Sequence, residues 1–365
     1  MSQDRQGQLN RIAIKGFKSI KECDVELRGV NVFVGANGAG KTNFISIFEM
    51  LSKVLSRELS FYTQKKGLAP LLYNGKGVTD SIFAEFQFGS ILYSYDLEWT
   101  EADTLFFREE QVYVDGKKIL GEGGYSESKA LYAIKNARIH TAIPQTVMFP
   151  GWRVYQFHDT SPSSRIKSEN IVANCDTFLH DASNLAAFLY RLHENHPAEY
   201  QKILRVIQRI APYFKDFELK PKEQNKEQIV LRWKQKDYDG TLIPSQLSDG
   251  TLRFICLATL LLQPEELQPD TIIIDEPELG LHPYAITIFA ELVKKAATRK
   301  QVILATQSAE LLNHFDPEDV IVVDRTENGS EFKRLDEDRL AEWLEDEYSL
   351  GELWNKNLFG GRVSR

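Results

Sequence analysis

The stretch Gly35-Ala36-Asn37-Gly38-Ala39-Gly40-Lys41-Thr42 decides the fold expected for this chain. It fits the pattern of a phosphate-binding loop, in which glycines let backbone amides turn inward around an anion. The apolar run from Val30 to Val34 before it, broken by Asn31, predicts a strand. Apolar residues then recur at helical spacing, at Phe44, Ile45, Phe48, Leu51, Val54 and Leu55. Strand, glycine loop and helix therefore follow one another in the order that phosphate binding requires.

Each residue type in this loop has an expected task. Gly35, Gly38 and Gly40 permit the inward turn, and the helix that follows adds its positive N-terminal end. Lys41 supplies a point charge for the outer phosphates, and Thr42 is expected to hold magnesium through its hydroxyl. The nucleotide-binding stretch also includes Ala36, Asn37 and Ala39. The loop predicts a nucleoside triphosphate with Mg²⁺, and the sequence lacks the Asn-Lys-x-Asp pattern that would indicate a GTPase.

A second segment, Thr271-Ile272-Ile273-Ile274-Asp275-Glu276, predicts a buried strand that ends in two carboxylates. Ligands of open α/β sheets bind at the carboxyl ends of the strands. Asp275 is expected to hold magnesium directly or through water, and Glu276 to polarise the attacking water. Taken alone, two acids after an apolar strand are as often the cap of a helix. Together with the phosphate loop, they favour the second half of a nucleotide site.

The third segment is Leu247-Ser248-Asp249-Gly250, which lies between the phosphate loop and the acidic strand. It resembles the signature of ABC-type ATPases, and this order of segments is the order in ABC-type heads. Ser248, Asp249 and Gly250 at the start of a helix form a second anion site, too far along the fold to serve the same phosphates. They therefore imply a second copy of the chain. The alternative is an ordinary helix cap by Ser248 or Asp249.

Three further segments resemble the same family. Gln156 resembles the Q-loop glutamine that reaches the magnesium and the attacking water, and the segment 277–283 resembles the D-loop. Ala305-Thr306-Gln307-Ser308 resembles the switch strand, and Gln307 stands where many heads have a histidine. A glutamine can hydrogen-bond a γ-phosphate or a water but cannot carry charge. The resemblance thus implies catalytic roles for Gln156 and Gln307 and slow or partner-stimulated hydrolysis.

From Gly16 to Trp354 the chain resembles the bacterial RecF/SMC-related AAA ATPases of anti-phage defence operons, in the form of an OLD-like head without a TOPRIM nuclease domain. The resemblance implies an α/β ABC-type head with a mixed or parallel central sheet, an antiparallel β subdomain and a compact helical insert. It also implies an ATPase that dimerises around Mg-ATP, each phosphate loop facing the other copy's signature. We expect any nuclease or toxin effector to be separately encoded, since little sequence follows the last strand.

Composition narrows the remaining classes. The 365 residues are 42% hydrophobic, which excludes disorder, and 44 basic against 52 acidic residues give a net charge of −8, which disfavours a globally basic nucleic-acid binder. The longest apolar runs, such as 254–262, fall short of the about 20 residues of a membrane helix. A soluble, cytoplasmic protein without membrane contact is expected. A DNA-maintenance ATPase that clamps duplex or gapped DNA stays open as the alternative to the defence role.

The rest of the sequence predicts the domain organisation. Strands are expected at 81–88, 91–99 and 105–114, the last closed by a turn at Asp115-Gly116. A loop with a short helix is expected over 121–150, and helices over 176–212 with a break near Pro197. Helices over 250–262, 283–298 and 308–314 alternate with strands over 271–275, 301–306 and 320–323. A single head thus divides into an N-terminal lobe (1–165), a helical insert (166–225) and a C-terminal lobe (226–365).

The histidines, the cysteines and an acidic run give weaker indications of structure and function. The histidines lack metal-ligand spacing, so no protein-ligated metal beyond the magnesium site is expected. Cys23, Cys175 and Cys256 are expected to be buried, reduced thiols. The acidic run 336–347 is typical of a solvated helix face.

Overall fold

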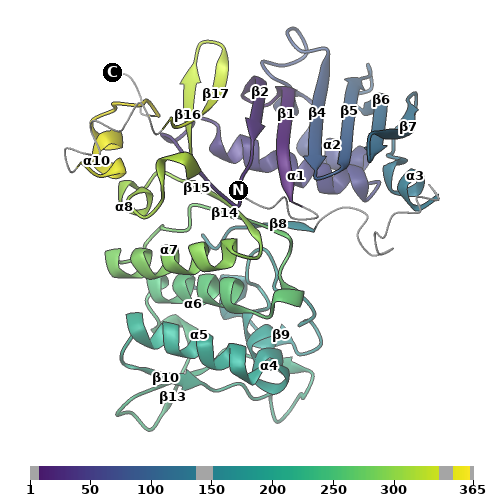
Figure 1. Cartoon of the computed structure of the whole chain (residues 1–365). Coiled ribbons are helices and arrows are strands. Elements are labelled where there is room, and N and C mark those ends of the chain that lie inside the picture. The colour runs from purple at the N-terminus through teal and green to yellow at the C-terminus, as the bar shows by residue number, and fades with distance from the viewer. Residues whose placement is uncertain (1–7, 137–150, 337–347, 362–365) are drawn as a thin grey trace. The chain divides into compact units, whose positions relative to one another are not determined.

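The computed structural model describes residues 8–136, 151–336 and 348–361 (Figure 1). The chain forms two compact units: Met1–Trp152 with Ala305–Arg365, and Arg153–Leu304. The lobe boundaries that we expected at residues 165 and 225 stay predictions. The acidic run 337–347 lies outside the described residues.

The first unit contains an antiparallel sheet of six strands in the order β2-β1-β4-β5-β6-β7. The strands are β1 (Leu9–Phe17), β2 (Ile20–Glu26), β4 (Ser81–Phe88), β5 (Ile91–Trp99), β6 (Leu105–Val114) and β7 (Lys117–Glu122). The expected spans of β4, β5 and β6 are confirmed. Asp115 (φ 50°) and Gly116 (φ 75°) form the turn between β6 and β7, because both positions of this turn type need a positive φ. The expected loop from residue 121 is wrong at its start, where Gly121 and Glu122 pair with β6.

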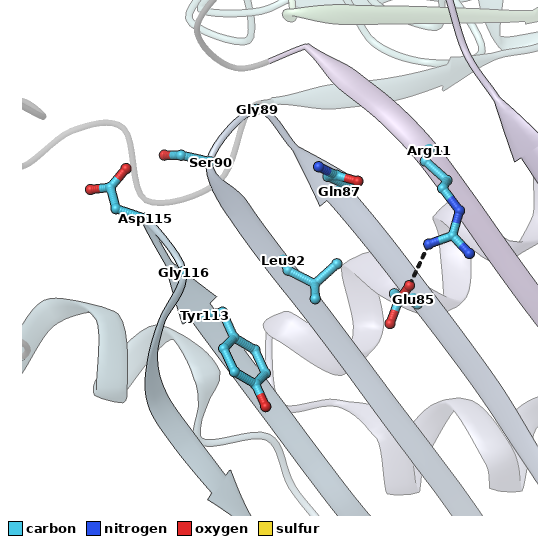
Figure 2. Close-up of a pocket in the computed structure, with 9 residues that line it drawn as sticks. All are labelled: Arg11, Glu85, Gln87, Gly89, Ser90, Leu92, Tyr113, Asp115 and Gly116. Atoms are coloured by element: carbon cyan, nitrogen blue, oxygen red, sulfur yellow. Dashed lines mark hydrogen bonds and ion pairs between the residues drawn. The ribbon is translucent and has the colours of Figure 1, made fainter.

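One face of this sheet is buried and the other is open. Helices α1 (Lys41–Leu55) and α2 (Leu59–Lys66) lie behind the sheet in Figure 1, and α3 (Ala130–Asn136) packs on β6 and β7. The open face carries a hollow of about 520 Å³, whose lining includes Arg11, Glu85, Tyr113 and Asp115 (Figure 2). Arg11 donates to Glu85 at 2.6 Å and pairs with Asp24. The arginine that lines this hollow is thus paired with two carboxylates.

A second set of strands in the first unit leads to the phosphate loop. The strands β3 (Val30–Val34), β16 (Val320–Thr326) and β17 (Gly329–Arg334) lie in the order β17-β16-β3. β16 pairs with β3 in parallel and with β17 antiparallel, so the sheet is mixed as expected. β17 was not expected from the sequence. The expected helix over 308–314 is shorter, as α8 (Ala309–Leu312), and α10 (Leu350–Asn355) packs on it.

The second unit places helices beside short strands. Its strands β15 (Gln301–Thr306), β14 (Thr271–Asp275) and β8 (Trp152–Tyr155) are neighbours in that order. α5 (Pro197–Ile210) packs on α4 (Leu185–Asn195) and on α6 (Asp249–Leu262), and α6 packs on α7 (Pro283–Ala297) (Figure 1). The helix break before Pro197 is confirmed, but residues 176–184 are not helical. Strand positions not expected from the sequence are β9 (Asn170–Ile171), β10 (Phe214–Phe217), β11 (Gln228–Ile229), β12 (Trp233–Gln235) and β13 (Thr241–Leu242).

Short 3₁₀ turns connect these elements, at Ala69–Leu71, Arg165–Lys167, Pro244–Gln246, Glu265–Leu267 and Pro317–Asp319.

Cys23 and Cys256 are buried as expected, and burial raises the pKa of Cys23 to about 12. Cys175 is only half-buried, which corrects that expectation. Within the described ranges, no helix is both long and apolar enough to cross a membrane.

A fully buried carboxylate, Glu110 on β6, fixes the segment that precedes α3. It accepts hydrogen bonds from Tyr93 Oη at 2.8 Å, Tyr125 Oη at 2.9 Å and the Lys129 amide at 2.9 Å, and also from the Ser128 hydroxyl. Burial and the nearby Glu110 carboxylate raise the pKa of both tyrosines, so their hydroxyls stay protonated and donate. A buried charge is stable here because donors surround it.

Replacing this carboxylate is expected to destabilise the fold. Glu110→Ala removes the acceptor shared by four donors, of which the Tyr93 and Ser128 hydroxyls belong to buried residues, so the free energy of unfolding should fall by about 3 kcal/mol in urea denaturation. The neighbouring Glu109→Ala removes an exposed carboxylate and should change it by less than about 0.5 kcal/mol. Equal effects of the two substitutions would contradict the assigned role of Glu110.

Candidate functional site

The phosphate loop begins directly after β3 and ends within the first turn of α1, as expected. Glycine is required in this loop because neighbouring strands leave no room for a side chain, and also because of the backbone conformation. A Cβ on Gly35 would collide with the Val323 carbonyl of β16, and a Cβ on Gly40 would collide with the Ser330 side chain of β17. Gly40 also has φ 124°, which side chains rarely tolerate. The neighbouring strands therefore hold the loop in its tight turn.

The loop has the chemistry of an anion site. Lys41 is 5% exposed, and its Nζ donates to the carbonyls of Gly35 at 2.7 Å and Ala36 at 3.1 Å. The N-cap of α1 is Gly40, which has no side chain to cap the helix, and the first turn contains no acidic residue. The positive helix end is thus not neutralised from within α1. A buried ammonium and an uncapped helix start fit the phosphates of a nucleotide.

Serine and asparagine side chains form a hydrogen-bonded group that contacts the backbone of the phosphate loop. Ser330 Oγ lies 2.5 Å from the Ala39 carbonyl and 2.7 Å from Ser19 Oγ, and Asn43 Nδ2 donates to Ser19 Oγ at 2.7 Å. Two of these three residues come from β17 and from the turn after β1. The sequence did not indicate them, because nothing in a lone serine indicates a partner far away in the chain.

The C-terminal tail also contacts the phosphate loop. The Ala36 amide donates to the Gly361 carbonyl at 2.6 Å, and the Gly361 amide donates to Asp324 Oδ1 at 2.5 Å. α10 holds the tail through buried Leu353 and Trp354. The family resemblance included this tail but assigned it no role.

In the second unit, β14 brings its carboxylate to a predicted partner. Asp275 is 3% exposed, and Gln156 Nε2 donates to its Oδ2 at 3.1 Å. The next residue, Glu276, is half-buried and has φ 47°, so the chain turns sharply and directs this second carboxylate elsewhere. A positive φ in a residue other than glycine is a strained conformation that is frequent at functional sites.

His158 supports the same strand end, which the sequence did not indicate. Its Nε2 lies 3.0 Å from the Asp275 carbonyl, and because a carbonyl only accepts, this nitrogen carries the proton. His158 stands two residues after Gln156 in the same loop. The loop is therefore attached to Asp275 through both a side chain and a backbone contact.

The signature segment starts α6. Ser248 is exposed and caps the helix, since its Oγ accepts from the Thr251 amide at 3.1 Å. Asp249 pairs with Lys167 at 3.5 Å, and a Cβ on Gly250 would collide with the Gly280 carbonyl. The capping role that we held as the alternative is thus present. Ser248 stays exposed to solvent in this capping role.

Gln307 directly follows β15 and belongs to the first unit, as the phosphate loop does. The next residue, Ser308, caps α8, and its amide donates to Thr306 Oγ1 at 2.9 Å. The contacts described here therefore join the predicted residues in two groups. The phosphate loop with its supports forms one group, and Gln156, Asp275 and Glu276 with the signature segment form the other.

A mixed α/β fold with a glycine-rich phosphate loop and an acidic strand end defines the class of P-loop nucleotide-binding domains. Residues 30–313 match the family described as "AAA domain, putative AbiEii toxin, Type IV TA system". The chain belongs to this family, and membership implies nucleotide binding.

Solved structures share the fold at low sequence identity. An SMC head bound to the C-winged helix domain of ScpA is 14% identical with a TM-score of 0.58, covering 92% of this chain and 99% of that chain. An SMC head with an extended coiled coil from Pyrococcus furiosus, bound to the C-terminal domain of ScpA, is 13% identical with a TM-score of 0.56, covering 93% and 98%. These similarities confirm the expected ABC-type head fold. No curated protein sequence matches the chain.

The tail contact leads to a test on Gly351, the second residue of α10. A Cβ there would collide with the Ala309 carbonyl, and the Gly351 amide donates to Asn313 Oδ1 at 2.6 Å. Gly351→Ala should displace α10, expose Trp354 and release the Ala36 amide. We expect red-shifted tryptophan emission and hydrogen exchange at 33–38 that is about tenfold faster. Gly77→Ala, whose Cβ would enter open space, should leave both signals unchanged; unchanged exchange in Gly351→Ala would refute the link between tail and loop.

Proposed function

We propose that the protein binds and hydrolyses ATP with Mg²⁺, and that two copies close around the nucleotide. The observation that carries nucleotide binding is the loop in which Lys41 lies over the carbonyls of Gly35 and Ala36, at an uncapped helix start. The observation that supports hydrolysis is the contact between Gln156 and Asp275 beside Glu276. The order of the segments in the sequence and the family support the proposal that both groups serve one nucleotide.

The chemistry assigns a task to each side chain. Lys41 binds the outer phosphates, and Thr42, Asp275 and Gln156 would hold the magnesium, which supplies positive charge to the phosphate oxygens. Glu276 accepts a proton from water as the water oxygen attacks the γ-phosphorus. The bond from this phosphorus to the bridging oxygen breaks, and ADP and phosphate leave. Gln307 is uncharged, which is consistent with slow or partner-stimulated turnover.

The exposed start of α6 supports the second copy. Ser248 and Gly250 lie at a helix N-terminus that is open to solvent on the Ser248 side, where an incoming γ-phosphate would find amides and a hydroxyl. ATP would then favour the closed pair because it contacts Lys41 of one copy and Ser248 of the other. Hydrolysis would weaken the pair.

The family description supports a biological role. It names a toxin of a toxin–antitoxin system, so we propose that the ATP-dependent switch regulates a separately encoded effector, a nuclease or toxin, in anti-phage defence. The two SMC heads with this fold are described as bound to domains of ScpA, which supports a protein partner. Affinity for that effector should change when ATP is added.

Loss of the lysine in the phosphate loop should weaken nucleotide binding. Lys41→Ala removes the buried ammonium from the phosphate loop, so the Kd for Mg-ATP should rise by at least about 100-fold in isothermal titration calorimetry. Lys53→Ala alters the same helix at an exposed ion pair with Glu58 and should leave the Kd unchanged. Wild-type affinity in the Lys41 variant would contradict the assigned site.

Loss of the proposed base should trap the closed pair. Glu276→Gln keeps the shape of the side chain but cannot accept the proton, so ATP should persist and light scattering should show twice the 41.8 kDa monomer mass. A double variant that adds Ser248→Arg should still bind Mg-ATP but should not form the pair. Adding Ser90→Arg instead, on the turn between β4 and β5, should leave pair formation unchanged. Normal turnover in Glu276→Gln would overturn the assignment of the base.

A further inference from the structure

Arg253 lies one turn into α6, after the signature segment, and its half-buried guanidinium contacts two loops of the second unit. Nε donates to the Phe157 carbonyl at 3.2 Å, Nη2 to the His158 carbonyl at 2.9 Å, and Nη1 to the Leu279 carbonyl at 2.9 Å. Nη2 also lies 3.4 Å from Thr160 Oγ1. One side chain of the signature helix thus holds both the loop after Gln156 and the turn after Glu276.

The contacts of Arg253 continue to Asp275. The His158 carbonyl accepts from Arg253, while the His158 ring donates from Nε2 to the Asp275 carbonyl at 3.0 Å. The Asp275 carbonyl belongs to the peptide that leads into Glu276. Arg253, His158 and Glu276 also line one small cavity. A displacement of Arg253 would therefore move the backbone that carries the proposed base.

A second connection reaches Glu276 from its other side. The Leu279 carbonyl accepts from Arg253, and the Leu279 amide donates to the Glu276 carbonyl at 3.3 Å. In addition, the signature residue Gly250 packs against the Gly280 carbonyl so closely that a Cβ would collide. The turn after Glu276 is thus in direct contact with the start of α6.

We propose that Arg253 is a positioning residue that joins the signature helix, the Gln156 loop and the Glu276 turn into one body, so that contact at Ser248 sets the placement of Glu276. This inference rests on the proposed ATPase function and adds regulation to it. Hydrolysis would then depend on Arg253, because a displaced base is a poor proton acceptor.

The arginine side chain suits this role by its shape. A guanidinium is planar and carries five N–H donors in a fixed fork, so it bonds several carbonyls in different directions at once. A lysine in its place would keep the charge but could not hold three carbonyls in the same geometry. Arg253→Lys is therefore a variant that separates charge from positioning, and Arg253→Met removes both.

The test compares Arg253→Met and Arg253→Lys with Arg299→Met in the full-length chain. Arg299 pairs with Glu265 at 3.2 Å on the surface of the same unit, and its side chain is 54% exposed, so it is the matched control. The first readout is hydrogen exchange of peptides covering 156–162 and 276–284 without nucleotide. The second is steady-state hydrolysis across ATP concentrations, with the Kd for Mg-ATP measured separately and the folded fraction checked by thermal unfolding.

Arg253→Met should exchange both peptides at least about tenfold faster and lower kcat at least about tenfold, while the Kd for ATP stays within about twofold. Arg253→Lys should fall between wild type and Arg253→Met, and Arg299→Met should match wild type. A purely structural role would lower the folded fraction without changing kcat per folded molecule, and would overturn the inference. So would unchanged exchange in Arg253→Met.

The experiment separates this inference from the proposed function. If the wild type binds and hydrolyses ATP but Arg253→Met turns over equally fast, the positioning role fails and the ATPase stands. If the wild type neither binds nor hydrolyses ATP, the proposed function fails and the inference fails with it, even where exchange confirms that Arg253 joins the loops.

Discussion

The first unit depends on a lack of space around its phosphate loop. Val323 and Ser330 leave no room for a side chain at positions 35 and 40, so the Val323 carbonyl of β16 and the Ser330 side chain of β17 shape the turn that presents amides to an anion. Of these two strands, β16 also aligns β3, which leads into the loop, because it pairs with β3 in parallel. A buried lysine is tolerated there because its ammonium already has two carbonyl partners before any ligand binds.

In the second unit, close contacts likewise determine the backbone conformation of one residue, Glu276. Glu276 adopts a left-handed backbone conformation at the end of a fully buried strand, and the hydrogen bonds of His158, Leu279 and Arg253 surround the turn. Such a conformation persists only where neighbours determine it. The strain is therefore evidence that the surroundings of Glu276 specify its position rather than merely permit it.

Local patterns predicted much of this molecule, and long-range backbone contacts explain what they missed. The glycine loop, the helix from Lys41 and strands β4 to β6 follow from short-range periodicity, as does β14 with its two acids. β9 to β13 are two to four residues long, too short for a clear periodicity, and β9 pairs with β11 across more than 50 residues. The contacts of Arg253 and His158 could not be predicted, because their partners are carbonyls, which every residue has. The contact of the C-terminal tail with the phosphate loop could not be predicted for the same reason.

The hydrogen bonds of the phosphate loop also order events during synthesis. The loop stands near the start of the chain, yet Ser330 bonds Ala39 across 291 positions, and the Ala36 amide waits for Gly361. Because a ribosome makes the N-terminal part first, the loop leaves the exit tunnel long before its partners exist. A nascent chain that carries all of the nucleotide-binding residues therefore still lacks the strands that shape them. All of the hydrogen bonds of the loop can therefore form only after residue 361 has been synthesised.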